Sequence, residues 1–246
     1  MKNASYLLRL FARWVVVTLS IWTLLLVAAG TTGLPSLRNY LVTLSSFLLA
    51  TMLNIDPGLA KERSRTSEQS GTPGRFAAGL SFLATLTVAA LDVGRFHWLH
   101  PVPADARQSS LLLFAGAMAL QMWAMVVNPF FSPDVRLQPE RGHRLITGGP
   151  YRLLRHPGYL AMLVAVPASA LSIGSWLALI PAAAFCLVIL KRVRAEEQFL
   201  QKSLAGYSEY MGRVRGRLFP RMDSPRPCRD SVSSTFASQG SDRRWP

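Results

Sequence analysis

Residues 110–127 read SLLLFAGAMALQMWAMVV, a run without a single charged side chain. A run of this kind approaches the roughly 20 apolar residues that a helix needs to cross the hydrocarbon of a bilayer. Five further apolar segments flank it, at 14–30, 39–53, 77–91, 159–173 and 175–190. The sequence therefore predicts an all-α integral membrane protein with about six transmembrane helices.

The composition of the chain favours the same fold class. Of its 246 residues 50% are hydrophobic and 16% are charged, whereas charged residues make up about 25% of an ordinary soluble domain. The net charge of +14 would also suit a protein that binds nucleic acid. No helix-turn-helix, zinc-finger or aromatic-basic sheet pattern accompanies that charge. We therefore expect the lipid bilayer, and not a nucleic acid, to be the partner.

The lysines and arginines are unevenly divided among the connecting segments. Only Arg38, Arg95 and Arg107 fall in alternate connections. Twenty others lie in the N-terminal arm and in the segments 54–76, 128–158 and 191–221. Because basic residues gather on the cytoplasmic side of a membrane, this asymmetry predicts six spans with both termini in the cytoplasm.

We expect one membrane domain, residues 1–221, without internal repeats. Its last two apolar segments are joined by residues 171–175, which predict a tight helical hairpin. Residues 222–246 are rich in Ser, Pro, Arg and Asp and lack periodicity, so they are expected to be a disordered tail. The cysteines form no CxxC pair and no metal-ligand cluster, so neither a disulfide framework nor a metal site is expected.

The segment 128–220 carries the polar residues that point to chemistry. Gly148, Gly149 and Pro150 predict a backbone turn. Pro157 suits the first position of a helix, with His156 immediately before it. The free N–H groups of that helix start would favour an anion such as a carboxylate. The alternative is a basic loop that simply ends a span at the membrane surface.

Arg192 and Glu196 lie four residues apart just beyond the last apolar segment. They share one face of a helix and could form an ordinary ion pair on a solvated surface. The other interpretation is that this face closes over the same cavity as the His156-Pro157 loop. A hairpin brings the cytoplasmic ends of its two helices together, so the geometry permits a shared site.

Three motifs in this order resemble the isoprenylcysteine carboxyl methyltransferase family. They are HRLITGGPY at 143–151, RHPGY at 155–159 and RVRAEEQFL at 192–200. The segments 206–210 and 215–220 also resemble the closing part of that family. The resemblance covers about the C-terminal 40% of the chain and implies an enzyme with a helical cofactor pocket open to the cytosol.

The resemblance implies a role for each matching position. Arg192 would face the carboxylate of the substrate and is the residue implied to be catalytic. The S-adenosylmethionine pocket would be lined by Gln138, His143, Arg144, Leu145, Ile146, Tyr151, His156, Pro157, Gly158, Tyr159 and Glu196.

The expected function is methylation of a carboxylate on a lipophilic or lipidated acceptor, by an enzyme of the bacterial inner membrane. A carboxylate is ionised at neutral pH and needs no general base; an amine or thiol acceptor would need one, and His156 would then be the candidate. The alternatives are a phospholipid N-methyltransferase, an NADPH-dependent membrane sterol-type reductase and a non-enzymatic scaffold. The adjacent Glu196 and Glu197 favour the methyltransferase over the reductase, and the concentration of ionisable residues at one face argues against a transporter or scaffold.

Overall fold

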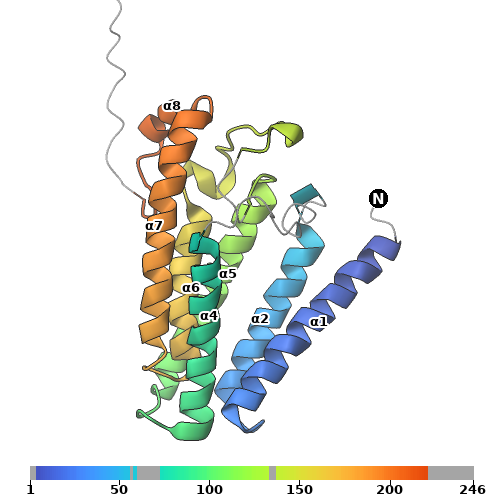
Figure 1. The fold of residues 1–246 in the computed structure, drawn as a ribbon, viewed down its shortest axis with the longest axis vertical. Coiled ribbons are helices and arrows are strands. Elements are labelled where there is room, and N and C mark those ends of the chain that lie inside the picture. The colour runs from blue at the N-terminus through green and yellow to red at the C-terminus, as the bar shows by residue number, and fades with distance from the viewer. Residues whose placement is uncertain (1–3, 56–57, 60–72, 133–136, 221–246) are drawn as a thin grey trace, which may run out of the picture.

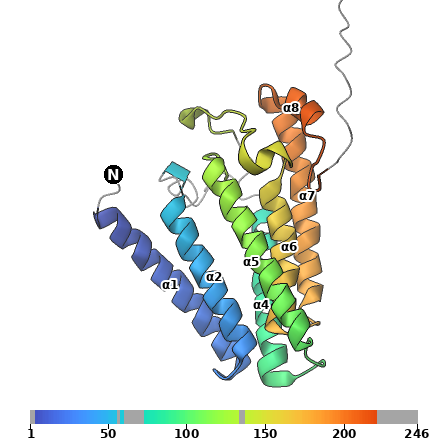
Figure 2. The ribbon, with the colours of Figure 1, turned by 180° about the vertical axis from the view of Figure 1, so that it is seen from behind.

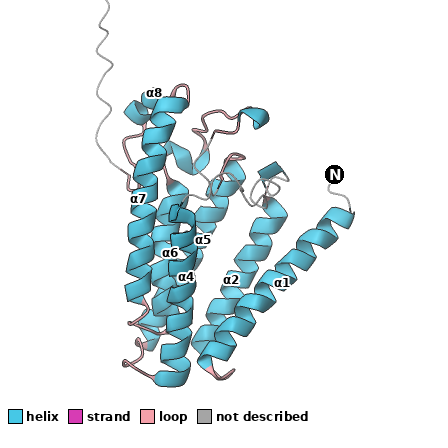
Figure 3. Ribbon diagram, in the orientation of Figure 1, coloured by secondary structure: helices cyan, strands magenta, loops and turns pink. Residues whose placement is uncertain are grey.

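The computed structural model describes residues 4–55, 58–59, 73–132 and 137–220. Within these ranges the secondary structure is helical and contains no strand (Figure 3), which confirms the all-α prediction for the described chain. The expected disordered tail, 222–246, lies outside the described residues. The elements are α1 (Ala4–Ala29), α2 (Pro35–Asn54), α4 (Pro73–Leu91), the π-helix η1 (Asp92–Phe96), α5 (Ala104–Val127), the 3₁₀ helices η2 (Pro139–Arg141) and η3 (Gly149–Arg152), α6 (Pro157–Ile173), α7 (Leu179–Ser203) and α8 (Tyr207–Arg213).

The six predicted apolar segments fall on the six long helices α1, α2, α4, α5, α6 and α7. Three stretches are long and apolar enough to cross a bilayer: Leu8–Ala29, Gly74–Phe96 and Ala104–Val127. The chain is accordingly an integral membrane protein. The apolar helix Pro157–Ile173 is shorter, and the count of six spans remains a prediction.

The long helices lie side by side, and α1 and α2 lean away from the others toward one end (Figures 1 and 2). That end also carries the N-terminus, α8 and the segment 137–156. The largest apolar core lies toward the opposite end, where Leu25, Leu37, Ala89 and Ile173 are buried together. The helices are therefore packed tightly at one end and spread at the other.

Polar contacts tie the connections together at the tightly packed end. The hydroxyl of Ser175 donates to Oδ2 of the buried Asp92 at 2.6 Å, and the N–H of Val102 donates to the carbonyl of Gly174 at 2.9 Å. Arg95 donates through Nη2 to the carbonyl of Val27 at 3.0 Å. These contacts hold the ends of α1, α4, α6 and α7 together. The helices therefore diverge only toward the opposite end.

The predicted helical hairpin is present, but its turn lies further along the chain. Residues 171–173 complete α6, and the connection runs over 174–178. Gly174 has a φ of +122°, which only glycine adopts without strain. Ser175 then accepts the N–H of Ala178 at 3.2 Å. The hydrogen bond to Asp92 holds Ser175 outside α7. The helix α7 therefore begins at Leu179, although the predicted apolar segment begins at residue 175.

Gly94 provides a test of the packing between η1 and α1. A Cβ at this position would lie 2.6 Å from Cα and 2.7 Å from Cβ of Ala29, so α1 would have to move. We expect Gly94→Ala to reduce the stability of the detergent-solubilised protein by about 1–3 kcal/mol, as in other overpacked sites, measured by its thermal unfolding midpoint.

Gly116→Ala is the matched control, because a Cβ at Gly116 in α5 meets nothing within 4 Å. That substitution replaces glycine by a better helix former and should leave the midpoint unchanged or raise it. Equal midpoints for the two variants would contradict the close approach of η1 to Ala29.

Candidate active site

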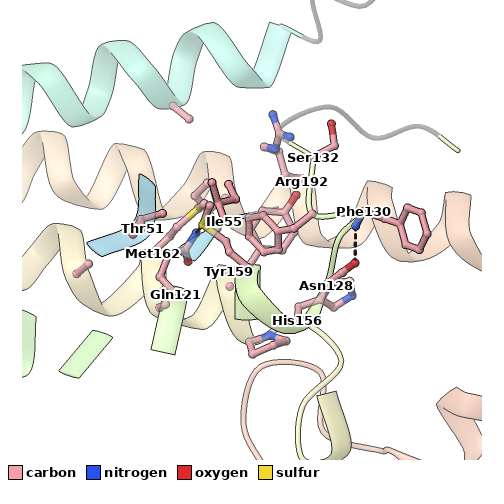
Figure 4. A pocket seen from close by; sticks show the side chains of 18 of the residues that line it. Thr51, Ile55, Gln121, Asn128, Phe130, Ser132, His156, Tyr159, Met162 and Arg192 are labelled. Atoms are coloured by element: carbon pink, nitrogen blue, oxygen red, sulfur yellow. Dashed lines mark hydrogen bonds between the residues drawn. The ribbon is translucent and has the colours of Figure 1, made fainter. Parts of the chain in front are cut away.

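A cavity of about 1190 Å³ opens between the spread ends of the helices (Figure 4). One part is lined by polar side chains from the 128–159 segment and from α7, among them His143, Tyr159, Arg192 and Glu196. The other part continues between α1, α2, α4, α5 and α6. There the walls are mostly apolar and include Val17, Ile21, Leu44, Leu48, Phe114, Met118 and Ala165.

Nearly all of the residues singled out from the sequence line this one cavity. They are Arg192, His143, Arg144, Leu145, Ile146, Tyr151, His156, Pro157, Gly158, Tyr159 and Glu196. Gln138 is placed elsewhere: it is fully buried behind the wall. Its Nε2 donates to the carbonyl of Phe130 at 3.1 Å, and its Oε1 accepts from Arg141 at 2.5 Å. Gln138 therefore supports the loop and does not line the cavity.

The loop before η3 is held by side-chain contacts to its own backbone. The N–H of Gln138 donates to Nδ1 of His143 at 3.2 Å, which places the imidazole proton on Nε2 when the ring is neutral. The His143 ring stacks on Phe130 with centroids 4.6 Å apart. Asn128 accepts the N–H of Phe130 at 2.9 Å (Figure 4) and donates to the hydroxyl of Tyr151 at 3.2 Å.

The start of α6 follows the sequence-based expectation. The helix begins at Pro157, with His156 in the capping position. His156 is 5% exposed, and burial, reinforced by the nearby Arg155 and Arg217 and opposed by Glu197, lowers its pKa to about 4. The imidazole is therefore neutral at pH 7. Its Nε2 lies 3.4 Å from the hydroxyl of Tyr207.

Arg155 and Glu197 form a buried ion pair that the sequence motifs did not single out as functional. Nε and Nη2 of Arg155 lie 2.7 and 2.6 Å from Oε1 of Glu197. Arg155 also donates through Nη1 to the carbonyls of Val214 and Arg215, at 2.7 and 3.0 Å. Arg217 contacts the other carboxylate oxygen of Glu197. The ion pair joins the start of α6, the end of α7 and the closing segment.

The neighbouring Glu196 faces the cavity instead. Adjacent residues of a helix point about 100° apart, so Glu196 lines the cavity while Glu197 points away from it. The Tyr159 hydroxyl donates to Oε2 of Glu196 at 2.5 Å. Burial raises the pKa of Glu196, while the Tyr159 hydrogen bond and the positive charge of Arg192 act in the opposite direction. The two glutamates that stand side by side in the sequence therefore have separate structural roles.

The comparisons with known proteins identify the same region. Residues 110–202 match the model of the isoprenylcysteine carboxyl methyltransferase family. The chain is also similar to a "Probable protein-S-isoprenylcysteine O-methyltransferase" from Oryza sativa subsp. indica and to one from subsp. japonica. Each is 30% identical over 113 residues, which are 44% of this chain and 58% of the relative. These matches confirm the resemblance seen in the motifs. The chain spans a little more than half the length of these two relatives.

The role of the Arg155–Glu197 pair can be tested by Glu197→Gln. This change leaves the buried Arg155 without its counter-charge, so we expect a loss of about 3–5 kcal/mol of stability, read as a lower thermal unfolding midpoint. Glu209→Gln is the control, since the Glu209 and Arg213 side chains are 77% and 64% exposed and exposed pairs contribute about 0–1 kcal/mol. Similar thermal unfolding midpoints for both variants would show that Glu197 does not stabilise the fold through Arg155.

Proposed function

We propose that this chain is a membrane-embedded S-adenosylmethionine-dependent methyltransferase that methylates a carboxylate on a lipophilic or lipidated acceptor. One observation carries the proposal: the motif residues line the polar part of a cavity whose other part is apolar and lies between membrane helices. Such a cavity can hold a polar cofactor and the headgroup of an amphiphile next to each other. Its apolar part suits the hydrocarbon portion of that amphiphile.

The polar part of the cavity offers a hydrogen-bond acceptor that suits the proposed cofactor. When bound, S-adenosylmethionine supplies an electrophilic methyl group on a cationic sulfonium. The carboxylate of Glu196 can accept hydrogen bonds from its hydroxyls or amine, and the motif segments His143–Ile146, Tyr151 and His156–Tyr159 would form the remaining walls. The low pKa of His156 keeps that ring uncharged, so it does not repel a nearby cation. Gln138 would contribute only indirectly, by fixing His143.

Arg192 is the residue we assign to the acceptor. Its guanidinium lines the same polar part and can bind both oxygens of a carboxylate, which fixes the orientation of the lone pair that attacks. Because the carboxylate is already ionised, the site needs alignment more than proton transfer. An amine acceptor, as in a phospholipid N-methyltransferase, would need a base. The rice relatives are named as O-methyltransferases, which favours the carboxylate.

The positions of the two glutamates also bear on the reductase alternative. Glu196 places a carboxyl group in the polar part of the cavity. In its ionised form this group is unfavourable for the phosphates of NADPH and favourable for a cationic cofactor. Titration of the purified protein with S-adenosylmethionine and with NADPH separates the two functions. If the protein binds NADPH and not S-adenosylmethionine, the methyltransferase proposal is refuted and the reductase alternative is supported.

The topology that belongs to this function has six spans, with both termini and the polar part of the cavity in the cytoplasm of a bacterium. The basic asymmetry of the loops supports it. A periplasm-active reporter fused after residue 246 should be silent, whereas the same reporter inserted after His100, in the α4–α5 connection, should be active. Activity of the reporter at residue 246 would refute the six-span arrangement.

Two variants should distinguish the role of Glu196 in cofactor binding from the role of Arg192 in methyl transfer. Glu196→Gln should weaken S-adenosylmethionine binding about tenfold, because an amide accepts hydrogen bonds less well than a carboxylate. Arg192→Lys should leave cofactor affinity nearly unchanged and slow methyl transfer to N-acetyl-S-farnesylcysteine, because lysine lacks the planar fork. Calorimetric titration and a radiolabelled methyl-transfer assay measure the two effects.

Arg194→Lys is the control for Arg192→Lys, since Arg194 is exposed on the same helix. It should match the parent in both assays. If Glu196→Gln and Arg192→Lys also match the parent, neither residue binds the cofactor or the acceptor and the proposed site is wrong.

A further inference from the structure

Two large apolar side chains are exposed at the end of the bundle that carries the candidate site. Phe219, in the closing segment 214–220, is 70% exposed, and Leu153, between η3 and α6, is 62% exposed. Their backbones are adjacent, because a Cβ on Gly216 would lie 2.6 Å from the carbonyl oxygen of Phe219 and 3.0 Å from that of Leu153. Neither side chain lines the cavity, so the proposed chemistry does not use them.

The packing of the closing segment indicates its depth in the membrane. The chain after α8 turns back along α7 (Figures 1 and 2), and Leu218 is buried in the same apolar cluster as Ile189 of α7. At this level the exposed surface of α7 changes from the apolar Leu190 to Lys191. Such a change marks the boundary between the hydrocarbon and the lipid headgroups. Phe219 follows Leu218 directly and therefore lies at that boundary.

The charges beside the two apolar side chains are positive. Arg152 immediately precedes Leu153 and is exposed, and Arg215 of the closing segment is half-buried. The sequences 149–155 and 214–220 contain no acidic residue. An arginine can bind a phosphate through two parallel hydrogen bonds, and an acyl chain can cover an exposed phenyl ring. This surface therefore has the charge and the apolar character that complement an anionic phospholipid.

A lipid bound here would act on the segment that holds the candidate site together. Gly216 and Arg217 accept the backbone N–H groups of Arg155 and His156 at 2.9 and 3.1 Å. The Arg155 guanidinium also donates to two carbonyls of the same segment. Residues 214–220 form neither helix nor strand, and segments of that kind open more readily than the helices around them.

We propose that Leu153 and Phe219, with the adjoining Arg152 and Arg215, form a docking surface for anionic phospholipids of the membrane leaflet at this end. Bound lipid holds the closing segment against the start of α6. The inference goes beyond the proposed function, since it concerns the lipid around the site and holds whichever cofactor the cavity takes. Each arginine near an anionic surface strengthens such binding about fivefold.

Hydrogen exchange of the Arg155 and His156 backbone amides tests the proposal, because these N–H groups are released when the closing segment opens. The full chain without cofactor is compared in nanodiscs of phosphatidylcholine and in nanodiscs that also contain phosphatidylglycerol. Both amides should exchange at least about fivefold more slowly in the anionic nanodiscs. High salt should remove most of this difference, because it screens the charges at the surface.

The double variant Arg152→Gln/Phe219→Ser removes one charge and one apolar side chain from the surface. Its two amides should exchange at rates within about twofold of each other in the two kinds of nanodisc. Its thermal midpoint in phosphatidylcholine should equal that of the parent, because both side chains are exposed. The matched control is Arg38→Gln/Phe96→Ser, which changes an exposed arginine and an exposed phenylalanine at the opposite end and should keep the parent's difference.

The inference is overturned if lipid charge does not change the exchange of the parent, if Arg152→Gln/Phe219→Ser keeps the difference, or if the control loses it. A lower midpoint for Arg152→Gln/Phe219→Ser would also overturn it, since the two side chains would then stabilise the fold itself. Slow exchange in both lipids that is lost on deletion of residues 222–246 would assign the surface to the C-terminal tail instead. Because no cofactor is present, failure of this test is separate from failure of the S-adenosylmethionine titration.

Discussion

The buried ion pair between Arg155 and Glu197 is the constraint on which the site depends. Each partner is less than a tenth exposed, so neither charge can be left alone without a large loss of stability. Arg155 also binds the carbonyls of Val214 and Arg215, while the backbone N–H groups of Arg155 and His156 donate to Gly216 and Arg217. One arginine thereby fixes the start of α6 against α7 and the closing segment.

The orientation of the neighbouring side chains follows from that constraint. With Glu197 turned toward Arg155, the helix geometry of α7 turns Glu196 toward Tyr159 and the cavity. The same cluster keeps His156 buried and neutral. A polar surface is thus assembled at the end of the bundle where α1 and α2 lean away (Figure 1), and the apolar part of the cavity adjoins it directly.

Much of the fold and of the candidate site could be predicted from local patterns. Uncharged apolar runs identified the helices because membrane spans need continuous apolar surface. Pro157 marked the start of α6 because its ring and missing N–H suit the first helical position. The hairpin turn was placed too early because the Ser175 contact to Asp92, 83 residues away in the chain, keeps Ser175 out of α7. Gln138 was assigned to the cavity wall from its resemblance, although its hydrogen bonds hold it behind the loop.

The sequence by itself determined that the chain is a helical membrane protein, which residue types gather at its basic end, and which motifs resemble a methyltransferase family. Only the tertiary structure decided which side of each motif faces the cavity. Glu196 and Glu197 are chemically identical and adjacent, and their different roles follow from what packs against each. Partners distant in the chain, which periodicity does not encode, set the environment of such side chains.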